Sequence, residues 1–337
     1  MVKWVNPQNN RDIIIASKVK IFRNIKGFKF ASLLKEEECK EIINKVLRVL
    51  DESSISENIY RVNIKCDYEL VDYEKESFGI SKDFLSSDNT ALIMSKNEEF
   101  NILLNEEEHI GIESTKSGLD LRGAFKVVNE LDDLLDGKFE YSFDDEFGYL
   151  TSNIKNLGTA LIGKVILHLP ALNLSGSMRD IKENLSEFGI NIRSMYRLGS
   201  RDIGNIYNIS NVKTIGLSEE DILDSLLSIA NKLVINEKRE RDKLLDEGEV
   251  ELKDTIYRAL GTLKNAYIID ISEGLKLLSY VRLGIELGII NDISLKAVNE
   301  AMINIQPSII NKTLKTKLNI QNIKLERAKI IRNALNT

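Results

Sequence analysis

The hydrophobic periodicity of the chain changes near residues 245–251, and this change strongly limits the folds it can adopt. Before it, stretches that alternate apolar and polar residues, as β-strands do, are interspersed with stretches of helical spacing. From about Glu251 onward, every periodic stretch has the spacing of an amphipathic helix. We therefore expect a mixed α+β domain over residues 1–248 and an all-helical domain over residues 249–337.

The strand patterns occur in neighbouring pairs. The first run, DIIIASKVKIF, is rich in β-branched residues and places Lys18 and Lys20 on one face. Two short strands, NTALIMS and FNILL, follow within residues 89–104. Residues 190–211 alternate like a strand pair joined by a flexible loop at residues 197–201. Because short connections join antiparallel strands, these pairs predict an antiparallel sheet.

Helical patterns lie between the strand pairs. Each has its apolar residues on one side, and one of them opens with Ser218 and Asp221, a pair typical of helix starts. The expected helices cover residues 35–50, about 119–135, about 177–187 and 218 to about 245. The first domain is therefore expected to be an antiparallel sheet flanked by helices.

The composition excludes some classes of function. The formal net charge is −6, and the basic residues are interspersed with acidic ones, so nothing indicates nucleic-acid binding. No apolar run reaches 18 residues, and the amino terminus lacks the apolar segment of a signal peptide. We expect no membrane association and a cytoplasmic location.

Cysteine and histidine give no indication of a metal site. Cys39 and Cys66 lack CxxC spacing, and no cluster of histidines accompanies them, so reduced structural thiols are expected. His109 and His168 have no partner visible in the sequence. Both are expected to be structural histidines with satisfied hydrogen bonds.

A long stretch at residues 147–172, FGYLTSNIKNLGTALIGKVILHLPAL, resembles the nucleophile-loop signature of the ATP:guanidino phosphotransferases. Four further segments resemble, in order, segments of the bacterial protein arginine kinases: ASKVKIFRN at 16–24, NEEEHIG at 105–111, IRSMYRLGSRDIGNIYNISN at 192–211 and LERAKIIR at 325–332. The resemblance covers nearly the whole chain. It implies a phosphagen-kinase-like phosphotransferase domain and a helical domain that binds phosphoarginine and dimerises.

Phosphoryl transfer from ATP requires cations fixed around the phosphates, because negative charge spreads over the transferring oxygens. The resemblance places Ser17, Lys18, Lys20, Arg23 and Arg193 at nucleotide-binding positions, with ATP and magnesium as the implied ligands. At positions 18 and 20 the family has arginine. A lysine binds phosphate as a point charge without the bidentate fork, so weakened nucleotide binding is expected. Without the resemblance, the two lysines would be the solvated face of an edge strand.

Other cations of the family are absent. Gly111 and Ile162 stand at two arginine positions, and Phe78 aligns with a nucleotide-contacting histidine. Each lost donor is expected to cost about 3 kcal/mol of transition-state stabilisation, on the order of a hundredfold in rate. Lys164 lies two residues beyond Ile162, shares its strand face and is the one compensating cation.

The residues that would face the guanidinium are changed as well. Asn153 takes the position of the reactive cysteine, and an amide carries no negative charge. Leu198 and Arg201 take two glutamate positions, and a cation at Arg201 would repel an arginine substrate. Glu107 retains the position of the family's carboxylate base. Judged without the resemblance, residues 106–108 would form a solvated acidic turn.

The resemblance also implies a phosphoarginine pocket in the helical domain. Arg327 and Ala328 keep an Arg-Ala pair of its last helix, whereas Ile323 and Lys324 replace the preceding Arg-Asp pair. Lys324 and Arg327 are therefore the expected remnant of this pocket, able to hold a phosphate without specificity.

Two hypotheses of function follow. The first is a pseudokinase-like adaptor or regulator in protein quality control or the stress response, with partners in the Clp and heat-shock regulatory system and a homodimer or a heterodimer with an active kinase. The alternative is an active ATP-dependent protein arginine kinase in which Lys18, Lys20, Lys164 and Arg197 supply the cations. A lesser possibility is that ATP or ADP binds as a conformational ligand without transfer.

Overall fold

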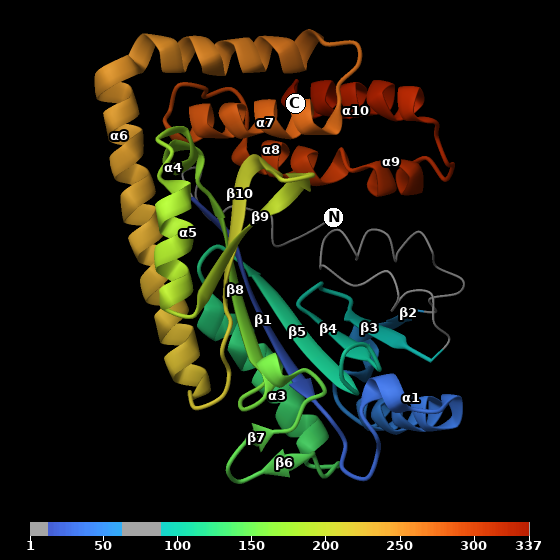
Figure 1. Cartoon of the computed structure of the whole chain (residues 1–337). Helices are drawn as coiled ribbons and strands as arrows, with labels where there is room; N and C mark the ends of the chain where they lie inside the picture. Colours follow the sequence, from blue (N-terminus) through green and yellow to red (C-terminus); the bar gives the residue numbers. More distant parts are fainter. Residues whose placement is uncertain (1–12, 63–88, 337) are drawn as a thin grey trace.

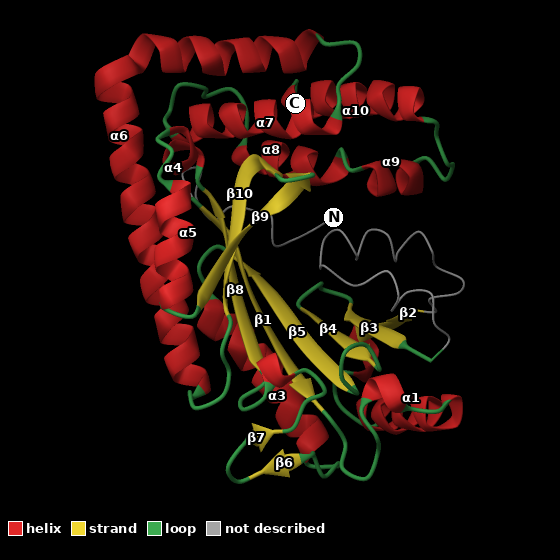
Figure 2. Cartoon of the chain, viewed as in Figure 1, coloured by secondary structure: helices red, strands yellow, loops and turns green. Residues whose placement is uncertain are grey.

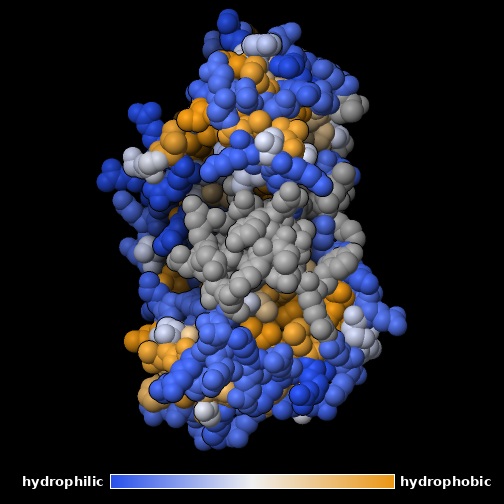
Figure 3. Space-filling model, turned by 90° about the vertical axis from the view of Figure 1, so that its right-hand side faces the viewer, coloured by the Kyte–Doolittle hydropathy of each residue, from blue (hydrophilic) through white to orange (hydrophobic). Residues whose placement is uncertain are grey.

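The computed structural model describes residues 13–62 and 89–336. Figures 1 and 2 show a strongly twisted antiparallel sheet with helices along one face and a group of helices across one end. On the side drawn in Figure 3, most of the described surface is hydrophilic, and hydrophobic side chains gather in patches in its upper and lower parts. No helix within the described ranges is long and apolar enough to cross a membrane.

The main sheet has eight strands in the order β2-β3-β4-β5-β1-β8-β10-β9, and every neighbouring pair is antiparallel. The strands are β1 (Ile14–Arg23), β2 (Ile59–Val62), β3 (Ala91–Ser95), β4 (Phe100–Leu104), β5 (Ile110–Ser117), β8 (Leu161–His168), β9 (Ile190–Leu198) and β10 (Arg201–Asn211). A separate hairpin joins β6 (Phe143–Asp144) and β7 (Gly148–Tyr149). The expected antiparallel sheet is confirmed. Because β1 lies between β5 and β8, it is an interior strand and not the edge strand considered above.

The helices form two groups. The first group comprises α1 (Glu36–Asp51), α3 (Leu121–Asp136), α4 (Pro170–Leu174), α5 (Met178–Glu187) and the first part of α6 (Glu219–Asn265). The second contains the rest of α6 with α7 (Ile271–Glu286), α8 (Leu295–Asn304), α9 (Pro307–Thr313) and α10 (Ile320–Leu335). The expected capping pair opens α6: Ser218 Oγ accepts a hydrogen bond from Asp221 N at 3.1 Å.

The core of the first domain lies between the sheet and its helices. Alternate residues of β1, Val19 and Ile21, are 0% and 2% exposed and belong to one apolar cluster with Val128 of α3 and Leu226 of α6. The period of two that buries these residues turns Lys18 and Lys20 to the opposite face of the sheet. The alternation in the sequence thus predicted the faces correctly.

Helix α6 runs through the expected division between the two domains. At Gly248 its backbone leaves the helical region, with φ −155° and ψ 41°, and Figure 1 shows the helix turning sharply where its two segments meet. The helix then continues to Asn265 and not only to about residue 245, as expected from the sequence. The helical group is also packed against the sheet, because Ile206 of β10 belongs to the same apolar cluster as Leu275 of α7.

A buried ionic network, centred on Glu286 of α7, connects the helical group to the sheet. Glu286 is 2.8 Å from Arg241 of α6, 2.9 Å from Arg282 and 3.1 Å from His168 of β8. Burial raises the pKa of the Glu286 carboxyl, but Arg282 and Arg241 outweigh this effect and lower it to about 2. For His168 burial acts in the other direction, because the charged form of an imidazole is the protonated one. It lowers the pKa of His168 to about 4, so the imidazole is neutral at neutral pH. As expected, His168 is a satisfied structural histidine.

Candidate functional site

Three lysines lie together on the face of the sheet opposite the first domain's core. Lys18 and Lys164 are directly opposite each other on β1 and β8, and Lys20 pairs in register with Glu113 of β5. We call Lys18, Lys20 and Lys164 the lysine cluster. Two of these lysines form ion pairs with glutamates: Lys18 Nζ is 2.9 Å from Glu113 Oε2, and Lys20 Nζ is 2.7 Å from Glu106 Oε2. The fold therefore brings together three predicted cations and partly neutralises them.

Burial and mutual interaction shift the pKa values of the groups in and beside this cluster. Burial raises the pKa of Glu113, but Lys18 and Lys20 outweigh that effect and hold it below its usual range. Burial and the nearby ammonium of Lys18 lower the pKa of Lys164 to about 8. Lys164 therefore loses its charge close to physiological pH, whereas an arginine at this place would keep it.

The hypothesis that the lysine cluster binds MgATP predicts an affinity that falls as the pH rises from 7 to 9. Lys164 is charged below its pKa of about 8 and neutral above it, and a charge-assisted hydrogen bond to phosphate contributes enough for about a tenfold effect. Isothermal titration across this range measures the change. In Lys164→Met the affinity should be lower and independent of pH; a wild-type profile that stays flat would contradict the assignment.

Lys20 occupies the space beside the first missing arginine. A Cβ atom added to Gly111 would lie 3.1 Å from Lys20 Cε and 3.8 Å from Leu103 Cβ. The Lys20 side chain thus crosses the position from which a residue 111 side chain would rise. Ile162, at the second missing position, pairs with Lys20 across β1 and β8 and offers no donor.

The other predicted nucleotide-binding residues are dispersed. Arg193 of β9 is exposed and points to the same face as Lys164, but it lies two strands across and two residues along, about 12 Å away. Ser17 is fully buried on the opposite face, where it donates to Gly118 O at 2.7 Å and accepts from Asp120 N at 3.0 Å. It therefore supports the start of α3.

Arg23 also lies away from the lysine cluster. It is 4% exposed, donates to Asp132 Oδ2 at 2.6 and 3.0 Å and stacks on the Tyr149 ring with 3.5 Å to the centroid. In a strand, residues an odd number apart point to opposite faces, and Arg23 is an odd number of residues from Lys18 and Lys20. In this structure Arg23 connects β1 to α3 and to β7.

The structure brings Glu107 and Asn153 into contact. Asn153 Nδ2 donates to Glu107 Oε1 at 2.6 Å, and Asn156 Nδ2 donates to the same oxygen at 3.3 Å. Asn153 also caps the short turn Ile154–Asn156 by accepting from Lys155 N at 3.1 Å. The carboxylate at the family's base position therefore faces two amide donors of its own chain.

Glu108 is a residue whose importance the sequence did not reveal. It is 1% exposed, and its carboxylate accepts from Asn24 Nδ2 at 2.7 Å, Ser152 N at 2.8 Å and Asn153 N at 3.2 Å. The expected solvated turn is thus wrong for Glu108, although Glu107 is exposed. The only signal was its place two residues before the apolar start of β5.

His109 follows Glu108 and is fully buried. Its Nδ1 accepts a hydrogen bond from Ile25 N at 3.0 Å, and its Nε2 lies 2.6 Å from Lys29 O. Burial lowers its pKa. This confirms the expected structural histidine. Cys39 is 4% exposed and free, with its thiol pKa raised by burial, whereas Cys66 and Phe78 lie outside the described residues.

Leu198 and Arg201 lie at the other end of the sheet. They face each other across the β9–β10 hairpin, so the connection has two residues and the expected flexible loop at 197–201 is wrong. The register places Glu107 beyond the Leu161 end of β8 and the hairpin tip beyond its His168 end (Figure 1). Eight residues of strand separate these ends by about 23 Å.

The remnant of the phosphoarginine pocket is occupied by internal contacts. Arg327 is 3% exposed and donates to Ile305 O at 2.9 Å and Ile269 O at 3.0 Å, and burial lowers its pKa. Lys324 Nζ is 2.8 Å from Asp270 Oδ1. Both side chains hold α10 against the segment that precedes α7.

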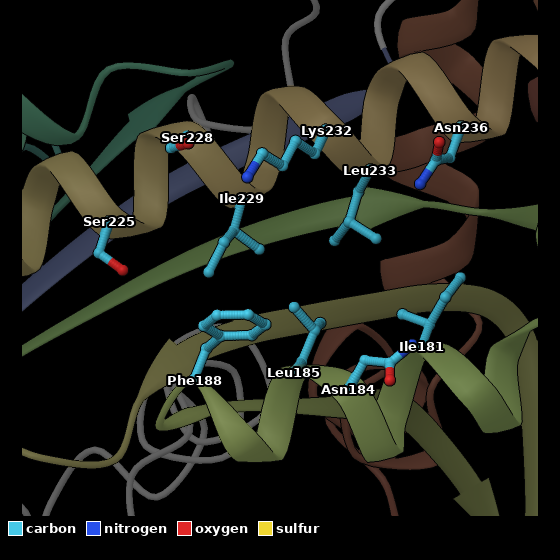
Figure 4. A pocket seen from close by; sticks show the side chains of 10 residues that line it. All are labelled: Ile181, Asn184, Leu185, Phe188, Ser225, Ser228, Ile229, Lys232, Leu233 and Asn236. Atoms are coloured by element: carbon cyan, nitrogen blue, oxygen red, sulfur yellow. The ribbon is translucent and has the colours of Figure 1, made fainter.

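Outside the lysine cluster, the largest feature that could take a ligand among those described is a groove beside α5. It has a volume of about 340 Å³ and lies between α5 and α6, and Figure 4 shows the side chains of Leu185, Phe188, Ile229 and Leu233 facing it. None of the predicted site residues lines it. No group of three or more His, Cys, Asp or Glu side chains in the described part of the chain could hold a metal ion. The residues that fit the phosphates of ATP are those of the lysine cluster, each as a separate point charge.

The antiparallel sheet has cations on one face and a carboxylate near one end, and its class, the ATP:guanidino phosphotransferases, is shown by comparison with known families. Residues 38–240 match the family model "ATP:guanido phosphotransferase, C-terminal catalytic domain". Among solved structures, the chain is similar to the duplicated taurocyamine kinase of Schistosoma mansoni, with a TM-score of 0.61 and 21% identity over 76% of this chain and 38% of that one. Lombricine kinase gives a TM-score of 0.58 and 18% identity, over 71% of this chain and 70% of that one. At these identities the likeness concerns the fold.

More similar relatives narrow the class. Residues 249–337 match the model "Protein-arginine kinase McsB C-terminal domain". A protein-arginine kinase of Clostridium perfringens is 58% identical over the full length of both chains, and one of Clostridium tetani is 34% identical over 99% of each. The chain belongs to the protein-arginine kinase family.

Proposed function

We propose that this chain is a pseudokinase-like adaptor or regulator that has lost most of the phosphotransfer of its family. The observation that carries the proposal is the hydrogen bond of 2.6 Å from the Asn153 amide to Glu107. A guanidinium is protonated and a poor nucleophile. Phosphoryl transfer to it therefore requires acidic groups that orient it and accept its proton. Here the neutral amide at the cysteine position donates to the one retained carboxylate and competes with such a substrate.

The phosphate side supports the same proposal. Gly111 and Ile162 stand at two arginine positions. Lys18 and Lys20, on the same face of the sheet, are paired with acids. Transition-state stabilisation in phosphoryl transfer depends on donors fixed around the phosphates, and each missing donor costs on the order of a hundredfold in rate. ATP with magnesium is the nucleotide we propose for the lysine cluster, bound weakly and without efficient transfer.

An adaptor acts through its surfaces, so its partners define its role. On the resemblance to the protein arginine kinases, we propose partners in the Clp and heat-shock regulatory system of the cytoplasm. A homodimer, or a heterodimer with an active kinase, is part of this proposal. In a heterodimer the helical domain and the nucleotide site could modulate the active subunit.

A second candidate is an active protein arginine kinase with a rearranged site. It is favoured by the placement of Lys20 over Gly111 and of Lys164 on the same face as the missing arginine at position 162. Arg197, the fourth cation of this hypothesis, lies near the hairpin tip, where it is 3.6 Å from Asp202, and not in the lysine cluster.

Phosphoarginine formation distinguishes the two candidates. Purified protein is incubated with magnesium, ATP and casein, and phosphoarginine is measured by mass spectrometry at neutral pH, which preserves the phosphoramidate bond. We expect no time-dependent phosphoarginine, while an intact family member in the same assay produces it. Stoichiometric product that disappears in Glu107→Gln would establish the second candidate and overturn the first.

A further inference from the structure

Strand β10 contains a sharp irregularity where the β9–β10 hairpin leaves the sheet. Gly204 and Asn205 have φ values of 76° and 52°, and the pairing of β9 with β10 shifts register between Ile203 and Tyr207. A positive φ is rare for a non-glycine residue and persists only where the surroundings impose it. The surroundings of Asn205 therefore determine the direction in which the hairpin extends.

Those surroundings come from α7 of the helical group and from the start of α4. Asn205 Nδ2 donates to Ser279 Oγ of α7 at 2.9 Å, and Asn173 Nδ2 donates to Asn205 Oδ1 at 2.8 Å. The Asn205 carbonyl accepts from Leu169 N at 2.9 Å. The nearest atoms to a Cβ added at Gly204 belong to Leu275 of α7, at 3.4 Å.

From Asn205, a series of hydrogen bonds leads through Ser279 and His168 to Glu286 of the buried ionic network. Ser279 Oγ lies 2.9 Å from His168 Nε2, and His168 Nδ1 lies 3.1 Å from Glu286 Oε2. With a neutral imidazole protonated on Nδ1, every contact has one donor and one acceptor: Asn205 donates to Ser279, Ser279 to His168, and His168 to Glu286. Arg241 and Arg282 face the same carboxylate, and Asn299 Oδ1 accepts from Arg282 Nε at 2.9 Å. A buried chain in which the hydrogen bonds from Asn205 to Glu286 are all made favours one arrangement of the groups it connects.

Apolar contacts hold the hairpin on the same side. Met195 and Tyr196 of β9 and Ile203 of β10 are partly buried against the apolar cluster that includes α7 and α8. The tip residues Leu198 and Arg201 are thereby kept beyond the His168 end of β8, away from Glu107.

We propose that Asn205 and Ser279 form a latch through which the helical group sets the position of the β9–β10 hairpin tip. The latch is made of one hydrogen bond at a strained bend, so a shift of α7 by a partner of the helical group releases the bend and moves Leu198 and Arg201. The two residues are positioning residues, and the latch does not depend on whether phosphotransfer occurs.

Hydrogen exchange of the full chain, followed by mass spectrometry, tests the latch through two variants. Ser279→Ala removes the acceptor for Asn205 and the donor for His168. Asn205→Gly removes only the side chain at the bend, and glycine adopts the same positive φ without strain. Both variants lose the hydrogen bond between Asn205 and Ser279, and each also loses one further bond, to His168 in Ser279→Ala and to Asn173 in Asn205→Gly. In both we expect the amides of residues 195–203 to exchange at least about fivefold to tenfold faster, the effect of the one bond that they share, with β1 and β8 unchanged.

Ser225→Ala is the matched control, because Ser225 is an exposed serine of α6 outside this chain of hydrogen bonds, and it should exchange as the wild type does. Trypsin cleavage after Arg197 and Arg201, both exposed, gives a second measure of the tip. Unchanged exchange at the tip in Asn205→Gly overturns the latch, even if Ser279→Ala has an effect. A uniform increase over all segments also overturns it, because the network would then support only global stability.

Discussion

Combining Asn153→Cys, Gly111→Arg, Ile162→Arg and Lys20→Arg is expected to produce time-dependent phosphoarginine, at least about a hundredfold above the background signal that the wild type gives. The four substitutions restore two missing phosphate donors, one planar guanidinium and the thiol beside Glu107. Loss of a single preorganised donor costs about a hundredfold to a thousandfold in rate, so recovery of two should be easily detected. Lys20 is included because an arginine there adds the planar fork that a lysine lacks.

Mass spectrometry of casein, as in the assay above, provides the measurement. Adding Glu107→Gln to the four substitutions is the control and should return the signal to background, because no retained carboxylate would accept the proton. A correctly folded variant without any gain would contradict the assignment of the loss to these positions. The cause would then lie at the hairpin tip, where Leu198 and Arg201 replace the family's glutamates.

Glu286→Ala is expected to lower the free energy of unfolding by about 3–5 kcal/mol. The substitution leaves Arg282 and Arg241, 0% and 5% exposed, without their shared carboxylate. Removing one partner of a buried ion pair is costly because the remaining charge stays desolvated. Urea denaturation measures the change, and Asp254→Ala, which removes an exposed partner of Arg258, should cost less than about 1 kcal/mol.

The same network predicts how stability depends on pH. The pKa of Glu286 is about 2 in the folded chain and ordinarily 4.5, so its stabilisation is present above pH 4.5 and is lost as the pH falls towards 2. The pKa of His168 is about 4 in the folded chain and ordinarily 6.5. The neutral imidazole therefore adds a further loss of stability as the pH falls from 6.5 to about 4. Glu286→Ala should therefore have a flatter acid profile than the wild type, and equal slopes would show that the carboxylate does not carry the effect.

The elements of the fold follow largely from local patterns. Alternation in β1 predicted that Lys18 and Lys20 share a face, and the capping pair at Ser218 predicted the start of α6. The same alternation places Arg23 on the face opposite Lys18 and Lys20, because it is an odd number of residues from both. The resemblance had nevertheless placed Arg23 and the two lysines at one nucleotide site. The hairpin was misjudged because glycine and serine at its tip indicated a flexible loop, whereas strand pairing continues to Leu198 and Arg201.

The sequence by itself determined the family and most of the strands and helices, and it predicts which residues replace those of the family. It did so because period, capping and motif order depend on neighbours within a few residues. Tertiary structure alone decided which groups meet: Arg23 with Asp132, 109 positions away, and His168 with Ser279, 111 positions away. Such pairs form only when distant segments pack and exclude water, since burial then requires each charge and hydrogen-bonding group to find a partner.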